Sequence, residues 1–431
     1  MEREKSKIIS RRDFITTGAI AATAISGFPF VKNAHAQSKK KLKIGVVGCG
    51  GRGTGACANA LVADPGNVDL VAMADVAPEQ IEKSLKALKE TRELQGELQN
   101  NIKVAKDHIF LGADGFKQLL QTDIDYVILT TPPGFRPLHF EEAVRQGKHI
   151  FAEKPVATDP VGCRNIRVSA QKAKDKGLSV VVGLNARHDK SVMETVKRIH
   201  DGAVGQIHAG SLHRLGGGLW HRGSDPRWSE MEYQCRNWYY FCWLSGDQIV
   251  EMVVHQIDLM NWTLDAHPIS ALGQGGRQIR TDPKYGNIYD HMTIDYEYPN
   301  DVHIFCMLRQ WDNCDNKNEN RVVGTLGETD SRRTIRGQNR WRYRGERSNS
   351  SVYEHQELIE SIRNATARND CLDFAVDSTL TAIMGRESAY TGKIVTWDEM
   401  IKSDLDLFPK NYQFGPAPQR PVSMPGEPRP V

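Results

Sequence analysis

The 431-residue sequence predicts an α/β protein in which a domain with a parallel sheet precedes an α+β domain with an open, mostly antiparallel sheet. Three observations support this prediction. Strand-like and helix-like segments alternate between residues 41 and 157, a glycine-rich turn joins the first such pair, and strand-like runs dominate residues 269–327. A chain of this length exceeds one ordinary core, so two domains are expected.

The first 36 residues have the pattern of an export signal. Ser10-Arg11-Arg12-Asp13-Phe14-Ile15 matches the twin-arginine pattern, a mildly apolar run extends to Phe30, and Ala34-His35-Ala36 is a small-x-small cleavage site. The apolar run is shorter than the ~20 residues that a membrane-spanning helix needs. We therefore expect a periplasmic protein without a membrane span, whose mature chain begins near Gln37. An uncleaved anchor is the alternative.

A glycine-rich turn follows the first strand-like run. Ile44, Val46 and Val47 lead into Gly48-x-Gly50-x-x-Gly53, and an Ala-rich helical segment follows. The first glycine permits a tight turn, the second lets the backbone approach a pyrophosphate, and the third lets the helix pack on its strand. The helix N-terminus then offers N–H groups and its positive dipole end to phosphates. The pattern predicts a Rossmann dinucleotide-binding domain.

The next apolar run ends at Asp75, 22 residues after Gly53. A carboxylate at this position can accept hydrogen bonds from both ribose hydroxyls of adenosine and would repel a 2′-phosphate. This favours NAD over NADP as the cofactor. The alternative is that Asp75 caps the helix that begins near Pro78.

Further strand-like runs extend the predicted parallel sheet. The run 125–130 ends at Thr131-Pro132-Pro133, and prolines stop strands. Ligands bind at the carboxyl ends of parallel strands, so Thr131 and Pro132 are expected to line a crevice. The next helix carries His139 and closes at Gly147, and the following strand-like run leads into Glu153-Lys154-Pro155.

The segment Gly-Lys-His-Ile-Phe-Ala-Glu-Lys-Pro at 147–155, after a glycine-fingerprint domain, resembles the Gfo/Idh/MocA oxidoreductases. The family is named for glucose–fructose oxidoreductase and inositol dehydrogenase. In it, the Lys of Glu-Lys-Pro lies at the nicotinamide and contacts the substrate hydroxyl, which implies this role for Lys154; the pattern alone is also that of a solvated loop lysine. The resemblance covers roughly Leu42 to Trp397 and includes 180–188, which is similar to the strand entering the second domain.

A second signature lies in residues 244–258. Glu251 and His255 are four residues apart, so they share one face of a helix, and Asp258 extends that face. The family usually has Asp-x-x-x-His here, which implies that His255 assists Lys154 in proton transfer and that the acid binds the sugar. This chain departs by having Glu251 where Asp is usual, which leaves the reach of the acid open but keeps its charge. A structural core histidine is the alternative.

Residues 215–243 are rich in glycine and aromatic side chains. Flat rings suit the C–H faces of sugars, although aromatics also fill cores and subunit interfaces. We expect Arg236 and Trp238 to line a pocket and the other rings to pack.

The predicted site follows from these motifs. The predicted catalytic residues are Lys154, His255 and Glu251. The predicted cofactor-binding residues are Gly48, Gly50, Gly51, Arg52, Gly53, Asp75, Thr131, Pro132, His139, Glu153 and Lys154. The predicted substrate-binding residues are Asn185, Arg187, Arg236, Trp238 and Asp258, of which Asn185 and Glu251 hold hydroxyls next to the reacting one. We expect the dinucleotide-binding domain at 41–157, the second domain at 158–400 and a Pro-rich tail at 401–431 that covers a neighbouring surface or stays mobile.

Composition limits the possible partners. The net charge of +3 argues against a nucleic-acid binder. The eight cysteines contain no C-x-x-C pair, so zinc is unsupported and no metal is predicted. Cys235/Cys242 or Cys306/Cys314 could form disulfides in an exported protein, and buried thiols are the alternative.

The predicted function is an NAD-dependent oxidation of a secondary hydroxyl in a sugar, glycoside or polyol. Because diffusible NAD is scarce outside the cytoplasmic membrane, we expect a tightly held cofactor. One alternative is NAD-dependent glycoside cleavage through transient C3 oxidation, as in family 109 glycosidases, which lack Glu-Lys-Pro at this position. Another is a non-catalytic sugar-binding protein. The second-domain sheets of relatives pair face to face, which implies a homo-oligomer formed through the exposed face of the 292–308 hairpin.

Overall fold

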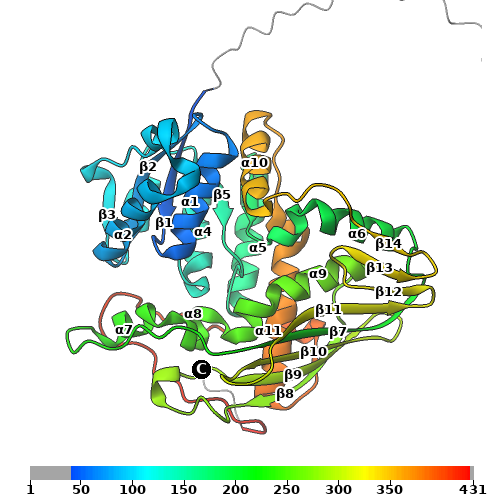
Figure 1. Ribbon diagram of the computed structural model, residues 1–431. Coiled ribbons are helices and arrows are strands. Elements are labelled where there is room, and N and C mark those ends of the chain that lie inside the picture. Colours follow the sequence, from blue (N-terminus) through cyan, green and yellow to red (C-terminus); the bar gives the residue numbers. More distant parts are fainter. Residues whose placement is uncertain (1–39, 428–431) are drawn as a thin grey trace, which may run out of the picture. The chain divides into compact units, whose positions relative to one another are not determined.

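The computed structural model describes residues 40–427, and Figure 1 shows how their helices and strands are arranged. The twin-arginine pattern, the apolar run and the cleavage site lie outside the described residues, as does the end of the predicted tail at 428–431. The predicted export signal therefore stays a prediction.

Within the described residues, six parallel strands form the first sheet, in the order β3-β2-β1-β4-β5-β6. The strands are β1 (Leu42–Val47), β2 (Val68–Asp75), β3 (Ile109–Leu111), β4 (Tyr126–Leu129), β5 (His149–Ala152) and β6 (Val180–Val182). The helices are α1 (Gly51–Ala63), α2 (Pro78–Glu90), α3 (Gly115–Leu120), α4 (Arg136–Arg145) and α5 (Pro160–Asp175). This strand order is that of a doubly wound dinucleotide-binding fold, which confirms the predicted fold class.

The first domain extends beyond the boundary predicted at residue 157. After Pro155 the chain forms α5, whose N-cap Asp159 accepts a hydrogen bond from the backbone N–H of Gly162 (2.6 Å). A crossover helix of this kind lets the chain add another parallel strand, here β6 beside β5. The first sheet therefore ends at Val182.

The second sheet of the described chain contains nine strands, in the order β14-β13-β12-β11-β7-β10-β9-β8-β15. Every neighbouring pair is antiparallel except β7 and β10, so the predicted open, mostly antiparallel sheet is confirmed. The strands are β7 (Ile207–Gly216), β8 (Ser270–Gly276), β9 (His291–Tyr298), β10 (Val302–Gln310), β11 (Lys317–Gly324), β12 (Gly327–Thr329), β13 (Thr334–Gly337), β14 (Trp341–Arg342) and β15 (Val395–Thr396). Buried and exposed residues alternate along β9 and β10 because helices cover only one face of the sheet.

Two helices of the second domain cover the inner face of this sheet, and a third packs back on the first domain. The helices are α6 (Lys190–His200), α7 (Glu230–Arg236), α8 (Cys242–Ser245), α9 (Val254–Leu264), α10 (Ser350–Arg363), α11 (Val376–Thr391) and α12 (Trp397–Lys402). Helix α11 lies between α9, α5 and β8, whereas α10 lies beside α1, as Figure 1 shows. Leu358 and Ile359 of α10 join the same apolar cluster as Ile44 of β1, so this helix packs back on the first domain.

The segment after α12 is irregular but hydrogen-bonded to the rest of the molecule. The backbone N–H of Leu407 donates to the carboxylate of Asp159 (3.0 Å). Farther on, the hydroxyl of Tyr289 donates to the carbonyl of Ser423 (2.8 Å), and the N–H of Gly426 donates to the carbonyl of Thr391 (3.1 Å). The described part of the predicted tail therefore lies on surfaces of its own chain.

The described residues contain no disulfide, and all cysteines except Cys235 and Cys314 are buried. Burial raises the pKa of the Cys57 thiol to about 12, so this thiol stays protonated near neutral pH. Of the two alternatives from the sequence, buried thiols describe the structure.

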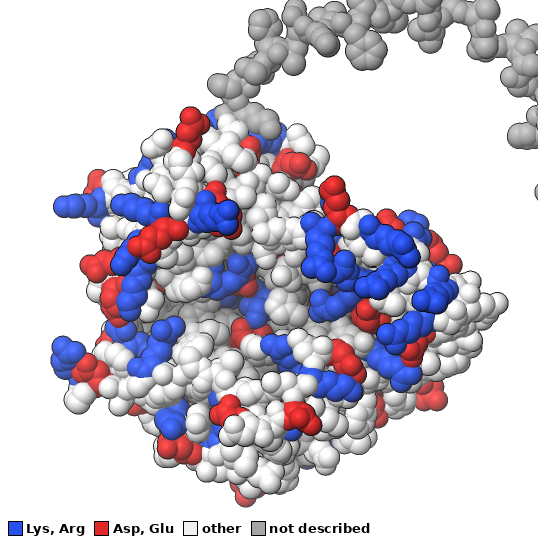
Figure 2. All heavy atoms as spheres, in the orientation of Figure 1, with Lys and Arg blue, Asp and Glu red and all other residues white. Residues whose placement is uncertain are grey.

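Positive charge gathers at one edge of the second sheet. Figure 2 shows Lys and Arg side chains concentrated over α6 and β12–β14. Arg340, Arg342 and Arg344 alternate there with Trp341 and Tyr343 and are exposed. The overall charge balance used in the sequence analysis does not reveal this local concentration. Charged side chains on an edge strand discourage pairing with another sheet, which accounts for them structurally.

Among the described residues, no helix combines the length and the apolar composition that crossing a membrane requires.

Candidate active site

The glycine turn between β1 and α1 is tightly packed against the protein at Gly48 and Gly53, and its backbone is unobstructed at Gly50. Gly48 has φ +94°, and a Cβ there would lie 2.7 Å from the N atom of Thr131. A Cβ on Gly53 would lie 1.9 Å from the carbonyl oxygen of Gly48, so helix α1 can approach β1 only with glycine at this position. At Gly50 an added Cβ would meet nothing within 4 Å. The turn therefore presents open backbone where a dinucleotide phosphate would bind.

The start of α1 and the carboxylate of Asp75 complete this turn. Gly50 is the N-cap of α1, no side chain caps the helix, and its first turn has no acidic residue, so its N–H groups are suited to an anion. Asp75 accepts hydrogen bonds from the backbone N–H groups of Cys49 (2.6 Å) and Ala77 (2.9 Å). Ala77, not Asp75, is the N-cap of α2. Asp75 thus anchors the turn itself and still has lone pairs for ribose hydroxyls.

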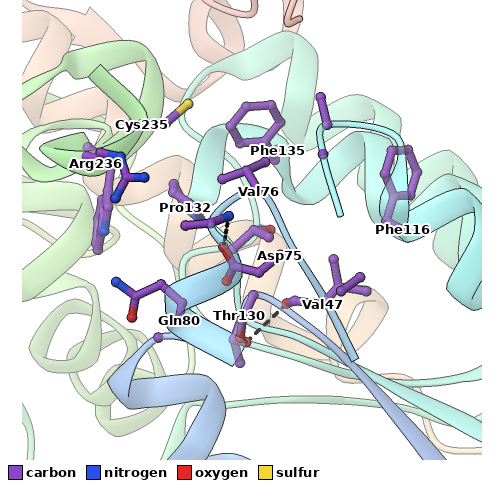
Figure 3. Close-up of a pocket in the computed structure, with 18 of the residues that line it drawn as sticks. Val47, Asp75, Val76, Gln80, Phe116, Thr130, Pro132, Phe135, Cys235 and Arg236 are labelled. Carbon is purple, nitrogen blue, oxygen red and sulfur yellow. Dashed lines mark hydrogen bonds between the residues drawn. The ribbon is translucent and has the colours of Figure 1, made fainter. Parts of the chain in front are cut away.

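An open cavity lies beside the glycine turn. It brings together the predicted residues Gly48, Gly50, Asp75, Thr131, Pro132, His139, Arg236 and Trp238. Figure 3 shows Cys235 and Arg236 of α7 opposite Asp75 and Pro132 of the first domain, with Phe116 and Phe135 on another side. The cavity thus includes the glycine turn and Asp75, where the adenosine and phosphates of a dinucleotide are predicted, whereas Lys154, Glu251 and His255 are not part of its lining.

His139 forms part of the apolar wall of this cavity. Its Nδ1 lies 3.1 Å from the Thr131 hydroxyl, and its ring lies 4.2 Å from that of Phe116, centroid to centroid. Burial lowers the pKa of His139 to about 3, and the charge of Arg136 acts in the same direction. The side chain is therefore a neutral wall and not a charge partner for phosphate.

Arg52 connects the glycine turn to the Glu-Lys-Pro segment. Its Nε donates to Glu153 Oε1 (2.6 Å), and another guanidinium nitrogen donates to Glu354 Oε1 of α10 (3.2 Å). Burial raises the pKa of Glu354 well above its usual range, and the nearby Glu153 carboxylate adds to this effect. The predicted residues Arg52 and Glu153 thus contact each other next to Lys154. Glu354 was not among the predicted site residues; its one signal in the sequence is an acid within the apolar face of a helix.

Lys154 is bonded to the second domain. Its Nζ donates to both the backbone carbonyl (2.6 Å) and the carboxylate Oε1 (2.7 Å) of Glu251. Glu251 lies in a π-helical turn, Ile249–Val253, that leads directly into α9. A π-turn interrupts the regular α-helical hydrogen bonding, so a carbonyl there can accept a bond from another segment. The regular i, i+4 geometry expected for Glu251 and His255 is replaced here by this turn.

His255 lies near the start of α9 and is partly exposed. Burial lowers its pKa well below the usual range, and the positive charge of Lys154 is the next largest cause. The imidazole is therefore neutral near pH 7, the state in which it can accept a proton. Lys154 and Glu251 are therefore in contact, and the charge of Lys154 acts on His255; the catalytic roles of all three stay predictions.

Comparison with known proteins identifies the family of this chain. Residues 42–183 match the family profile "Oxidoreductase family, NAD-binding Rossmann fold", and residues 192–330 match the "GFO/IDH/MocA C-terminal domain". The chain belongs to the GFO/IDH/MocA family. The resemblance recognised in the Glu-Lys-Pro segment is confirmed, and NAD is the cofactor that the family's first domain binds.

Individual relatives share less than the whole chain. An inositol 2-dehydrogenase of Rhizobium meliloti (strain 1021) is 28% identical over 172 residues, which are 40% of this chain and 46% of that protein. A scyllo-inositol 2-dehydrogenase (NAD(+)) of Bacillus subtilis (strain 168) is 25% identical over 183 residues, 42% of this chain and 47% of that protein. The chain spans about half the length of the curated relatives it matches.

A solved structure shows the same fold over a longer stretch. The scyllo-inositol dehydrogenase from Lactobacillus casei with bound cofactor NAD(H) and scyllo-inositol has a TM-score of 0.61 and 19% identity, and the match covers 84% of this chain and 100% of that chain.

In this GFO/IDH/MocA protein, two of the predicted substrate-binding residues bind each other. Arg187 Nε lies 3.0 Å from each carboxylate oxygen of Asp258, and the Ser378 hydroxyl donates to the same carboxylate (2.8 Å). Asp258 is fully buried, and the Arg187 guanidinium lies over the Phe374 ring at 3.8 Å. The structure thus gives Arg187 and Asp258 a structural ion pair in place of the predicted substrate contacts. Asn185 opens the short 3₁₀ helix η5 (Asn185–His188), is partly exposed, and stays a predicted substrate residue.

Arg236 and Trp238 line the cavity beside the glycine turn, which agrees with the predicted pocket lining, and their substrate role stays a prediction. Arg236 donates to Glu232 (2.9 Å) and to Glu79 of α2, which ties α7 to the first domain. The sequence gives no signal for the Arg236–Glu79 contact, since 157 positions separate the two residues. Among the described residues, no group of three or more His, Cys, Asp or Glu side chains is arranged to hold a metal ion.

Proposed function

We propose that this protein is an NAD-dependent oxidoreductase that oxidises a secondary hydroxyl of a sugar, glycoside or polyol and holds its cofactor tightly. The observation that carries the proposal is the double hydrogen bond from Lys154 to Glu251. This bond joins the Glu-Lys-Pro segment to the helix that carries His255. Arg52 links the same segment to the glycine turn. The names of the relatives, inositol 2-dehydrogenase and scyllo-inositol 2-dehydrogenase (NAD(+)), support a polyol or sugar as the substrate class.

NAD, when bound, supplies the hydride acceptor for the alcohol carbon. The residues of the chain handle the hydroxyl proton. The neutral imidazole of His255 accepts it, and the Lys154 ammonium donates a hydrogen bond to the alcohol oxygen as negative charge develops there. Glu251 holds Lys154 in place through two acceptor atoms and offers its other carboxylate oxygen to a neighbouring hydroxyl. Asn185 serves a further hydroxyl.

Tight retention of NAD is the part of the proposal that fits an exported enzyme. A cofactor at nanomolar outside concentration stays bound only if its dissociation constant is nanomolar or lower, about −12 kcal/mol. The open backbone at Gly50, the carboxylate of Asp75 and the wall formed by Thr131 and Pro132 supply separate contacts for different parts of a dinucleotide.

The decisive test is to purify the mature chain without added nucleotide, denature it and identify the released compounds by chromatography. We expect near-stoichiometric NAD(H), and we expect a sugar or inositol substrate to reduce the bound cofactor, seen as absorbance at 340 nm. An apo protein that needs millimolar NAD would contradict tight retention. Release of nitrophenol from a nitrophenyl glycoside without net NADH formation would favour the glycoside-cleaving alternative.

We propose that the chain is exported through its twin-arginine signal. The pattern Ser10–Ile15 and the small-x-small site at Ala34–Ala36 support this. Fractionation of cells that express the wild type and an Arg11→Lys/Arg12→Lys variant tests it, with the variant expected to remain in the cytoplasm. Equal export of both chains would contradict the proposal.

We also propose a homo-oligomer that forms through the outer face of the second sheet. Leu272 of β8 and Phe305 of β10 both pair with Asp295 of β9, so they share one row on that face, and both are exposed. Phe305→Asp is expected to shift the protein to a monomer in light scattering, because it places a charge in the contact. Val168→Asp, which changes an exposed apolar residue of α5, is the control and is expected to leave the mass unchanged. A monomeric wild type would contradict the proposal.

A further inference from the structure

The cavity beside the glycine turn has a wall that comes from the end of the chain. The first domain supplies one side of the cavity, and Arg222, Cys235, Arg236 and Trp238 of the second domain also line it. Tyr412 and Phe414 also line the cavity. We name residues 403–427, which follow α12, the C-terminal strap.

The strap is bonded to the first domain at the rim of the cavity. The Tyr412 hydroxyl donates to Asp114 Oδ1 (2.8 Å), and the Gln413 side-chain amide donates to Asp114 Oδ2 (2.9 Å). Lys117 Nζ donates to the Tyr412 hydroxyl (3.2 Å). Asp114 is the N-cap of α3, so these bonds fix the strap to the loop that follows β3.

The strap then crosses to the opposite side of the cavity. The carbonyl of Gly415 accepts a hydrogen bond from the N–H of Met231 (2.9 Å), and the carbonyl of Pro418 accepts one from the Gln234 amide (3.0 Å). Both donors belong to α7, which the Arg236–Glu79 ion pair ties to α2. Phe414 lies between these anchors, is 42% exposed and lines the cavity. The strap therefore bridges the cavity from one rim to the other.

The part of the cavity next to the strap has an aromatic wall. The Tyr412 ring packs edge to face against Phe135 (6.3 Å between centroids, 83° between planes), and Phe135 stacks on the neutral imidazole of His139 (5.8 Å, 16°). Flat apolar walls of this kind suit a planar heterocyclic base. Val76 and Ala113, which follow β2 and β3, also line the cavity, so this part continues from the Asp75 carboxylate. The base next to a ribose held by Asp75 is the adenine of NAD.

We propose that the C-terminal strap forms the outer wall of the adenine site, that Phe414 contacts the adenine ring, and that the strap must detach before NAD can leave. This inference rests on the proposed function and adds the device that retains the cofactor. A strap with a merely structural role would stabilise the fold without changing the rate at which the nucleotide leaves.

The test measures the release rate of the nucleotide, not turnover. Protein loaded with NADH is mixed with excess NAD+, and the loss of energy transfer from tryptophan to NADH reports release. We expect Phe414→Ala to release NADH about tenfold faster or more, the scale of one lost base–aromatic stacking contact. Tyr412→Phe removes the hydroxyl that bonds Asp114 and is expected to speed release by about tenfold. The double variant is expected to be faster than either single variant.

Val168→Ala is the control, because Val168 is an exposed apolar residue of α5 that does not line the cavity. Thermal unfolding of each variant shows whether the fold is intact. The two single variants and the double variant are expected to stay folded, because the other strap contacts remain. If Phe414→Ala and the double variant release NADH at the rate of the wild type, the strap proposal is wrong and the proposed function is not affected. A folded wild type that binds no NADH would instead contradict the proposed function.

Discussion

Replacing Lys154 with alanine is expected to lower turnover by at least about a hundredfold while the protein keeps its bound NAD. The side chain supplies the ammonium that bonds both acceptor atoms of Glu251 and that lies close enough to His255 to lower the pKa of the imidazole. Its loss removes the donor to the alcohol oxygen in the proposed reaction. The glycine turn and Asp75 are unchanged, so NAD remains bound. The measurements are kcat with a reducing sugar or inositol and the amount of NAD released on denaturation.

Lys174→Ala is the control for this variant, because Lys174 is an exposed lysine of α5. It is expected to leave both turnover and NAD content unchanged. Turnover of Lys154→Ala within a few-fold of the wild type would remove Lys154 from the catalytic group. Loss of NAD together with turnover would show that the lysine acts mainly on the cofactor.

Asp258→Ala is expected to destabilise the protein by about 3–5 kcal/mol, because it leaves the Arg187 guanidinium as a largely buried charge without its partner. The Ser378 hydroxyl also loses its acceptor. Denaturant unfolding of the wild type and the variant measures this loss. Under native conditions the folded variant is expected to keep its KM for the sugar, since the carboxylate is buried and already bonded.

The double variant Arg187→Met/Asp258→Ala separates the two roles considered for this pair. It removes both charges and is expected to recover part of the lost stability, because no unpaired charge remains. Unchanged stability of Asp258→Ala together with a raised KM would instead support the substrate contact that the family resemblance implied.

Local sequence was sufficient to predict a structural feature where one short segment forms that feature. Gly48, Gly50 and Gly53 follow one strand directly, and each position is restricted by atoms a few residues away or by the neighbouring strand end. The alternation of β9 and β10 was equally visible, because one face of the hairpin is covered and the other is not. The site residues that depend on these segments, such as Asp75 and Thr131, were placed correctly beside the turn.

Pattern alone was misleading where a helix departs from regular geometry or where charges find partners within the fold. The spacing of Glu251, His255 and Asp258 indicated one continuous helix face. The π-turn at Ile249–Val253 changes the backbone geometry at Glu251, and Asp258 forms an ion pair with Arg187. Neither the π-turn nor the ion pair can be read from the hydrophobic periodicity of the sequence, because both depend on the residues that pack around the helix.

The sequence by itself determined the family, the two sheet types and the NAD-binding turn. These follow from contiguous motifs whose residues have only one suitable local conformation. Only the tertiary structure decided which acids pair with Arg52, Lys154, Arg187 and Arg236, and that Tyr412 and Phe414 return to line the cavity beside the glycine turn. The residues in these contacts are far apart in the sequence. The contacts form because burial makes each charge or polar group find a partner, and the partner is chosen by the packing of the whole chain.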